Sequence, residues 1–221
     1  MVADRSAPLT WVRESGMFLL LVLLIATVFI IPAVIPFGAT LLMANRVMLT
    51  LVLISGVLAV ADHRRLAIAL AAIAFVVVAI AWAQALLPIE TFPALREIVV
   101  VGALLVLAFA VGINVFTSGH AIGDRVFGAI VLYLLLGLTW AVAYQAVEKL
   151  VPGSFTQSPD PNAGLSGWFY FSFVTLTTVG YGDIAPVTQA ARSLAILEAL
   201  IGQLYPAIII ARLVSLQTSS K

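Results

Sequence analysis

Long apolar segments, separated by charged or proline-rich turns, constrain the fold of this chain more than any other feature. A helix needs about 20 residues to cross the hydrocarbon core of a bilayer. Six segments approach or exceed this length and are predicted to be transmembrane helices: residues 17–37, 45–61, 66–87, 98–116, 125–147 and 188–214. The sequence therefore predicts an all-α membrane protein with six transmembrane helices.

The composition agrees with a membrane protein and excludes several other classes. The 221 residues are 63% hydrophobic and 10% charged, whereas soluble domains are about half apolar and a quarter charged. A net charge of +1 gives no basic surface for nucleic acid. The absence of cysteine excludes disulfides and thiolate chemistry. His63 and His120 match no catalytic or metal-binding spacing, so we do not expect an enzyme.

One segment between the last two predicted transmembrane helices cannot cross the membrane. Residues 167–176 are predicted to form a helix, capped by Ser166, that is too short to span the bilayer. The chain must therefore enter the membrane and return, and the returning limb is residues 177–183, TTVGYGD. Its two glycines permit backbone dihedrals barred to other residues, which lets successive carbonyls face one way. Such irregular backbone survives in a bilayer only where protein buries it or where it lines a water-filled path.

Residues 178–182, TVGYG, are similar to the selectivity filter of tetrameric potassium channels. The chain resembles the small bacterial six-transmembrane type of this family. The resemblance is specific over residues 125–214, whereas over residues 17–116 it is limited to the number of spans. It implies a homotetramer, because each chain supplies one filter strand and four strands enclose an ion.

The resemblance also implies roles for individual residues. Potassium ions would be held, without an organic cofactor, by the backbone carbonyls of Thr178, Val179, Gly180 and Tyr181. The hydroxyl of Thr178 would close the innermost site, and Gly182 would face the outer vestibule. Thr177 would end the pore helix, whose C-terminal dipole favours a cation.

The pore helix departs from the family pattern at Tyr170 and Phe171, where these channels commonly have two tryptophans. The tryptophans form an aromatic cuff and bond the aspartate after the filter, here Asp183. Tyr170 can still donate its hydroxyl to Asp183, whereas Phe171 has no donor. The alternative is that both aromatic side chains only pack the helix.

The fourth predicted span departs more strongly. Voltage-gated relatives carry arginines at every third residue of this span, and each charge that moves through the field contributes about 2.3 kcal/mol per 100 mV. Residues 98–116 contain neither arginine nor lysine, and Arg96 lies only at the entrance. We therefore expect weak voltage dependence or none.

The last predicted span contains three residues of interest: Glu198, Gly202 and Pro206. A carboxylate in an apolar span is usually functional or paired. Glu198 either faces the cavity and attracts cations or lies behind the filter, protonated or bonded to Thr175 or Thr177. Gly202 is either a gating hinge or a site of close helix packing, and Pro206 is expected to bend the helix nearby.

Six spans place both termini on one side of the membrane. Seven of the 11 basic residues fall on that side: Arg5, Arg13, Arg64, Arg65, Arg125, Arg212 and Lys221. The positive-inside rule then predicts cytoplasmic termini in the cell (inner) membrane. We expect a four-helix domain over residues 1–116 and a pore domain over residues 117–221.

The sequence favours a potassium-selective channel that conducts passively. The alternatives are a nonselective cation channel and a non-conducting regulatory subunit of a mixed tetramer. Expected partners are further copies of the chain and membrane lipid, with no nucleic acid and, because few residues follow residue 214, no soluble ligand domain. The sequence does not indicate which stimulus opens the gate.

Overall fold

The computed structural model describes residues 7–60, 64–86, 94–116 and 122–219. Within these ranges the regular structure is helical, and the only β pairing is an isolated bridge between Phe155 and Pro186. The elements are α1 (Ala7–Ile25), η1 (Ala26–Ile30), α2 (Ile31–Val34), α3 (Ala39–Ala59), α4 (Arg64–Leu86), α5 (Leu95–Phe116), α6 (Ile122–Leu150), η2 (Pro161–Ala163), α7 (Ser166–Leu176) and α8 (Gln189–Ser219). The predicted all-α membrane fold is confirmed.

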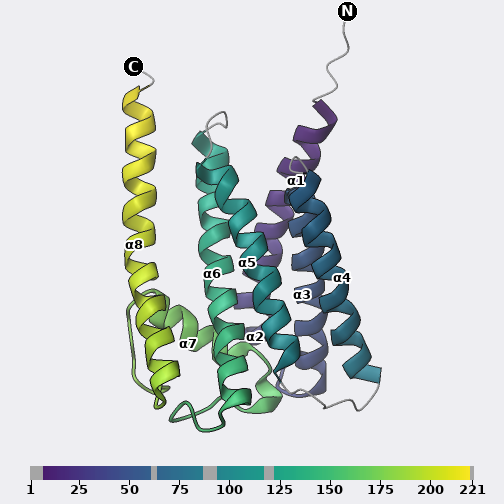
Figure 1. The fold of residues 1–221 in the computed structure, drawn as a ribbon, viewed down its shortest axis with the longest axis vertical. Helices are drawn as coiled ribbons and strands as arrows, with labels where there is room; N and C mark the ends of the chain where they lie inside the picture. Colours follow the sequence, from purple (N-terminus) through teal and green to yellow (C-terminus); the bar gives the residue numbers. More distant parts are fainter. Residues whose placement is uncertain (1–6, 61–63, 87–93, 117–121, 220–221) are drawn as a thin grey trace, which may run out of the picture.

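The long helices lie side by side along one axis, and the short helix α7 lies across the bundle near one end (Figure 1). α5 packs against α6, α1 packs against α3, and α4 packs against both α3 and α5. α8 stands at one edge and contacts α6 and α7. The start of α1 and the end of α8 lie at the same end of the bundle, opposite the end where α7 is found (Figure 1).

Five of the helical segments are long and apolar enough to cross a membrane: Gly16–Val34, Ala39–Ala59, Leu95–Ile113, Arg125–Leu150 and Gln189–Arg212. α4 has 23 residues, and its described side chains include a shorter apolar stretch, Ala67–Ile80. It corresponds to the predicted span at residues 66–87. His63 and His120 lie outside the described residues.

Two predicted boundaries differ from the structure. α3 begins at Ala39, six residues before the predicted start at residue 45, so Arg46 lies inside this helix and not at its beginning. The prediction was wrong because we began the segment beside this charge, although a long arginine near a helix end can extend toward the membrane surface. The first span was predicted to end at residue 37, whereas its helical part runs from α1 through the π-helical turn η1 and ends with α2 at Val34. Pro32 occupies an early position of α2, where its missing N–H is tolerated.

Leucine and valine side chains from neighbouring helices form the core that holds the bundle. Leu20 of α1, Leu53 of α3, Leu104 of α5 and Leu135 of α6 are fully buried and belong to one cluster. Burying such a side chain contributes about 1.5–3 kcal/mol in water, but between helices in lipid the close packing itself carries more of the stabilisation. α6 thus forms the support on which α7 and α8 are placed.

A salt bridge joins α5 to α6 at the end of the bundle near α7. Glu97 is 1% exposed, and its Oε1 accepts hydrogen bonds of 2.7 Å from both Arg96 Nη2 and Lys149 Nζ. Arg96, the basic residue nearest the start of the fourth predicted span, is therefore held in a fixed pair.

Candidate ion-binding filter

The short helix α7 has 11 residues and ends at Leu176, and after its C-cap residue Thr177 the TVGYG segment begins. Its predicted cap is wrong, because Leu165 precedes the helix without a side-chain cap and Ser166 is its first residue. The Ser166 hydroxyl instead donates to the carbonyl of Ala163 at 2.6 Å, which closes the turn at η2. The serine therefore fixes the approach to the helix.

The backbone of the filter segment alternates in handedness. Thr178, Gly180 and Gly182 have positive φ values of 60°, 59° and 79°. A Cβ at Gly180 or Gly182 would meet no atom within 4 Å, so the backbone conformation, and not lack of space, favours glycine there. Alternation of this kind allows successive carbonyls to face the same side of a short extended strand.

The hydrogen bonds of this segment are one-sided. The N–H groups of Val179 and Gly180 both donate to the carbonyl of Val174, at 3.0 and 3.3 Å, and the N–H of Thr178 donates to Thr175 at 2.9 Å. Within the described part of the chain, no backbone N–H donates to the carbonyls of residues 178–181. The amides thus hold the strand to α7 while the carbonyl oxygens stay available to another donor or to a cation.

Gln203 of α8 supports the innermost part of the filter, and sequence reasoning missed it. Its Nε2 donates to the Thr178 hydroxyl oxygen at 3.0 Å. Thr178 needs such support, because a β-branched residue at positive φ is strained by roughly 1–2 kcal/mol. The available signal was Gln203 itself, a polar amide next to Gly202 in an otherwise apolar span.

The two cuff positions have different environments. The hydroxyl of Tyr170 hydrogen-bonds Asp183, and the role of this contact as a brace for the filter stays a prediction. The ring of Tyr170 stacks on that of Tyr181, with centroids 6.3 Å apart and planes inclined by 4°. Phe171 is buried and packs edge-on against Tyr144, with centroids 4.8 Å apart. The packing alternative therefore holds for Phe171, while Tyr170 contacts both the filter tyrosine and the aspartate after it.

Glu198 lies behind the pore helix with no exposed surface. Its Oε2 accepts a hydrogen bond of 2.5 Å from Tyr144 of α6, and its Oε1 accepts one of 2.6 Å from Ser172 of α7. The predicted partners Thr175 and Thr177 were wrong, because their hydroxyls donate to carbonyls one turn back in their own helix. Glu198 thus ties three helices together.

Gly202 marks the closest approach of α8 to the end of α7. A Cβ at this position would lie 1.9 Å from the carbonyl oxygen of Leu176. The close-packing interpretation is therefore confirmed, and the hinge stays a prediction. α8 continues as a helix through Pro206 to Ser219, and the neighbouring Tyr205 donates its hydroxyl to Ala129 of α6 at 2.7 Å.

The exit of the filter is fastened to the loop after α6. Thr156 donates its N–H to Ala185 at 2.9 Å, and Val187 donates its N–H to Ser154 at 2.8 Å. Glu148 accepts from the N–H of Ser154 at 3.0 Å and so holds that loop to the end of α6. Both ends of the filter segment are therefore anchored by the same chain.

A short entering helix and a strand with available carbonyls, held between two long membrane helices, define the pore-loop architecture of ion channels. Comparison of sequences agrees, since residues 129–218 match the family model described as Ion channel. The match begins within α6, so α1 to α5 fall outside it. Among the described residues no three His, Cys, Asp or Glu side chains gather as a metal site. The comparisons indicate an ion transport protein.

Three relatives illustrate this similarity. The chain is 40% identical over 84 residues to two pore potassium channel c of Oryza sativa subsp. japonica, covering 38% of this chain and 18% of that protein. It is 39% identical over 77 residues to the inward rectifier potassium channel Kirbac3.1 of Paramagnetospirillum magnetotacticum, covering 33% and 23%. It is 41% identical over 86 residues to protein LctB of Geobacillus stearothermophilus, covering 37% and 62%.

The chain thus spans less than two thirds of each of these relatives. No solved structure matches it significantly.

Proposed function

We propose that four copies of this chain form a membrane pore that conducts potassium passively and selectively through the filter segment. The observation that carries the proposal is the one-sided strand of residues 178–182, with alternating positive φ and carbonyls that accept no N–H from the described backbone. Rings of such carbonyls can replace the hydration shell of potassium. The names of two relatives, both potassium channels, support the choice of ion.

The requirement for several copies follows from where the filter lies. Val179 and Tyr181 are 53% and 71% exposed in the single chain. Polar backbone cannot face lipid without a hydrogen-bonding partner. The open side of the filter must therefore face other chains and water, and a symmetric ring of four meets that need.

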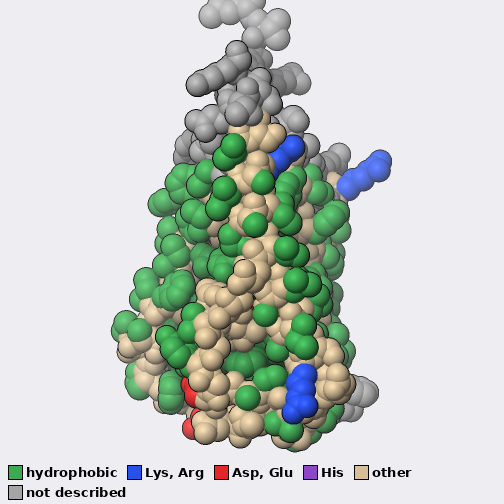
Figure 2. Space-filling view, turned by 90° about the vertical axis from the view of Figure 1, so that its left-hand side faces the viewer, with side chains coloured by type: hydrophobic (Ala, Val, Ile, Leu, Met, Phe, Trp, Pro, Cys, Tyr) green, Lys and Arg blue, Asp and Glu red, His purple; other side chains and the backbone are tan. Residues whose placement is uncertain are grey.

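The surface of α8 is suited to the same assembly. Three of its apolar side chains, Ile196, Leu200 and Ile208, are each more than half exposed in the single chain. Figure 2 shows this side of the molecule, with hydrophobic side chains over most of its height and the few visible charged side chains near its two ends. In the proposed tetramer α8 lines the pore below the filter and contacts the neighbouring copies.

We place the pore domain at residues 117–221. We place the chain in the cell membrane with both termini on the cytoplasmic side, because the distribution of basic residues favours this orientation. Because α5 contains no basic residue after Arg96, which is paired with Glu97, voltage has little charge to act on. The four helices at residues 1–116 thus serve as a packing partner of the pore.

Potassium flux from vesicles containing only this chain tests the proposal. We expect flux under a potassium gradient that sodium does not replace. Equal sodium flux would indicate a nonselective cation channel. The absence of any flux from correctly assembled protein would indicate a non-conducting subunit of a mixed tetramer.

A further inference from the structure

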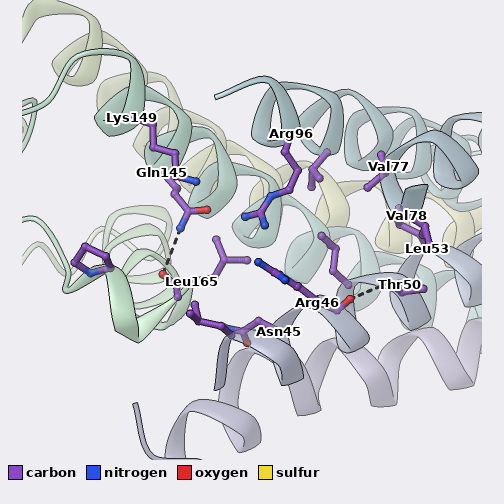
Figure 3. Close-up of a pocket in the computed structure, with 15 residues that line it drawn as sticks. Asn45, Arg46, Thr50, Leu53, Val77, Val78, Arg96, Gln145, Lys149 and Leu165 are labelled. Atoms are coloured by element: carbon purple, nitrogen blue, oxygen red, sulfur yellow. Dashed lines mark hydrogen bonds between the residues drawn. The ribbon is translucent and has the colours of Figure 1, made fainter. Parts of the chain in front are cut away.

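A pocket of about 250 Å³ lies on the opposite side of α6 from the pore, at the end of the bundle near α7. It is lined by side chains of α3, α4, α5 and α6 and by the turn that leads into α7 (Figure 3). The pocket takes no part in the filter.

Three basic side chains from three helices line this pocket: Arg46 of α3, Arg96 of α5 and Lys149 of α6. No carboxylate is among the lining residues. Glu97 lies alongside and pairs with Arg96 and Lys149, so three positive charges and one negative charge leave a local charge of +2. Such a pocket repels cations and favours an anion.

Arg46 carries one of these two positive charges alone. It forms no ion pair with a described residue, and its buried Nε has no hydrogen-bond partner. Figure 3 shows the guanidinium groups of Arg46 and Arg96 turned toward the same space. Two like charges that converge without an acid between them are unfavourable unless an anion joins them.

Asn45 provides a second and independent observation. It is only 7% exposed, and neither its side-chain oxygen nor its nitrogen forms a hydrogen bond. Buried amides in proteins are normally bonded, because an unpaired one costs about 1–3 kcal/mol. An anion bound between Arg46 and Asn45 would accept from the amide as well as from the guanidinium.

The rest of the lining is apolar and includes Leu49, Leu53 and Val100. One side of the pocket is thus suited to a charged head and the other to hydrocarbon. Basic pockets between transmembrane helices on the cytoplasmic side of membranes bind anionic lipid head groups, and the same combination of charge and apolar lining is present here at the end of the bundle opposite the termini. A phosphate matches the site, because its several oxygens can accept from two guanidinium groups, an ammonium and an amide together.

We propose that this pocket binds the phosphate of an anionic phospholipid, with Arg46, Arg96 and Asn45 on the phosphate and the apolar lining on an acyl chain. The occupant would also contact the approach to the pore helix. Gly164 and Leu165, immediately before α7, line the pocket, and Gln145 donates to the Gly164 carbonyl at 3.4 Å. The site is independent of whether the filter conducts.

The experiment measures binding of short-chain phosphatidic acid to the purified, assembled full chain in a neutral detergent. We expect saturable binding that Arg46→Gln weakens about tenfold or more, as for loss of a charge-assisted bond. The control is Arg192→Gln, which removes an exposed arginine at the same end of the bundle and outside the pocket. Asn45→Leu should also weaken binding and should fold well, since the amide it removes is unpaired.

Short-chain phosphatidylcholine and inorganic phosphate complete the test. Weak binding of both, beside tight binding of phosphatidic acid, supports the lipid site. If inorganic phosphate binds as tightly as phosphatidic acid, the site takes a free anion and the lipid proposal is wrong. Equal affinity of phosphatidylcholine, whose phosphate is balanced by a choline cation, would mean that the pocket does not select an anionic head group. A loss in Arg192→Gln as large as in Arg46→Gln would mean that binding does not depend on the pocket. Unchanged binding in both Arg46→Gln and Asn45→Leu would also overturn it.

Discussion

The hydroxyl of Tyr144 lies 2.5 Å from the carboxylate of Glu198, so that the outer helix α6 and the inner helix α8 are joined behind the pore helix. Ser172 of α7 bonds the other carboxylate oxygen at 2.6 Å. Both contacts are fully buried. The filter is therefore supported from behind by a polar connection between three helices.

Removing the tyrosine hydroxyl should weaken this connection. Tyr144→Phe leaves one buried carboxylate oxygen without its donor, which costs about 1–3 kcal/mol. We expect the assembled protein to dissociate at a lower denaturant concentration. Tyr133→Phe on the same helix is the control, because within the described residues Tyr133 makes no hydrogen bond with its hydroxyl. Equal stability of the Tyr144 and Tyr133 variants would contradict a supporting role for the pair.

Tyr170→Phe tests the brace between the pore helix and Asp183. The variant keeps the ring on Tyr181 and removes only the hydroxyl that bonds Asp183. We expect currents to decay faster during sustained opening, measured in single-channel recordings. A decay rate unchanged from that of the wild type would show that Tyr170 only packs the helix.

The same pair predicts a pH response. The hydrogen bond to Asp183 raises the pKa of Tyr170 above its ordinary value. A raised tyrosine pKa means that the contribution of the bond is fully present below about pH 10 and is lost as pH rises through the raised value. Wild-type decay should approach that of Tyr170→Phe only at strongly alkaline pH. Convergence of the two near neutral pH would contradict this assignment.

Gly202→Ala should disturb the contact between α8 and α7. The added Cβ would lie 1.9 Å from the Leu176 carbonyl oxygen, so one of the two helices must move. Overpacking of this kind costs about 1–3 kcal/mol, and we expect lower stability and altered conduction. Gly102→Ala is the matched control, because a Cβ there meets nothing within 4 Å. A hinge without a packing role would instead change gating alone and leave stability as in Gly102→Ala.

Gln203 and Thr178 should act as one unit. Gln203→Leu and Thr178→Ala each remove one side of a 3.0 Å hydrogen bond, so each should reduce potassium selectivity. The double variant should lose little more than the stronger single variant, because contacting residues are not additive. Fully additive losses, measured as permeability ratios, would show that the bond does not join the two residues.

The sequence predicted the helices well because each apolar run matches the bilayer thickness, and charges or prolines mark most of the ends. It failed at α3, where Arg46 lies inside the helix and not at its start. The contact between Tyr170 and Asp183 is present where the family resemblance implied it, while the ion-binding role of the filter residues stays a prediction.

Contacts between distant segments could not be predicted in the same way. The partners of Glu198 were wrong, since the rotation of α7 places Ser172 and not Thr175 toward α8. The ion pair between Glu97 and Lys149 joins residues 52 positions apart, and no spacing rule relates them. The orientations of packed helices decide such contacts, and the periodicity of one helix does not specify those of its neighbours.

The most direct test of the account is the reversal potential of purified, reconstituted protein in mixed potassium and sodium, recorded across a range of voltages. We expect the reversal potential to follow the potassium gradient and the open probability to vary little with voltage, since α5 carries no movable basic residue. A reversal potential that ignores the potassium gradient would contradict the potassium filter. A steep conductance–voltage curve would contradict the absence of a sensor.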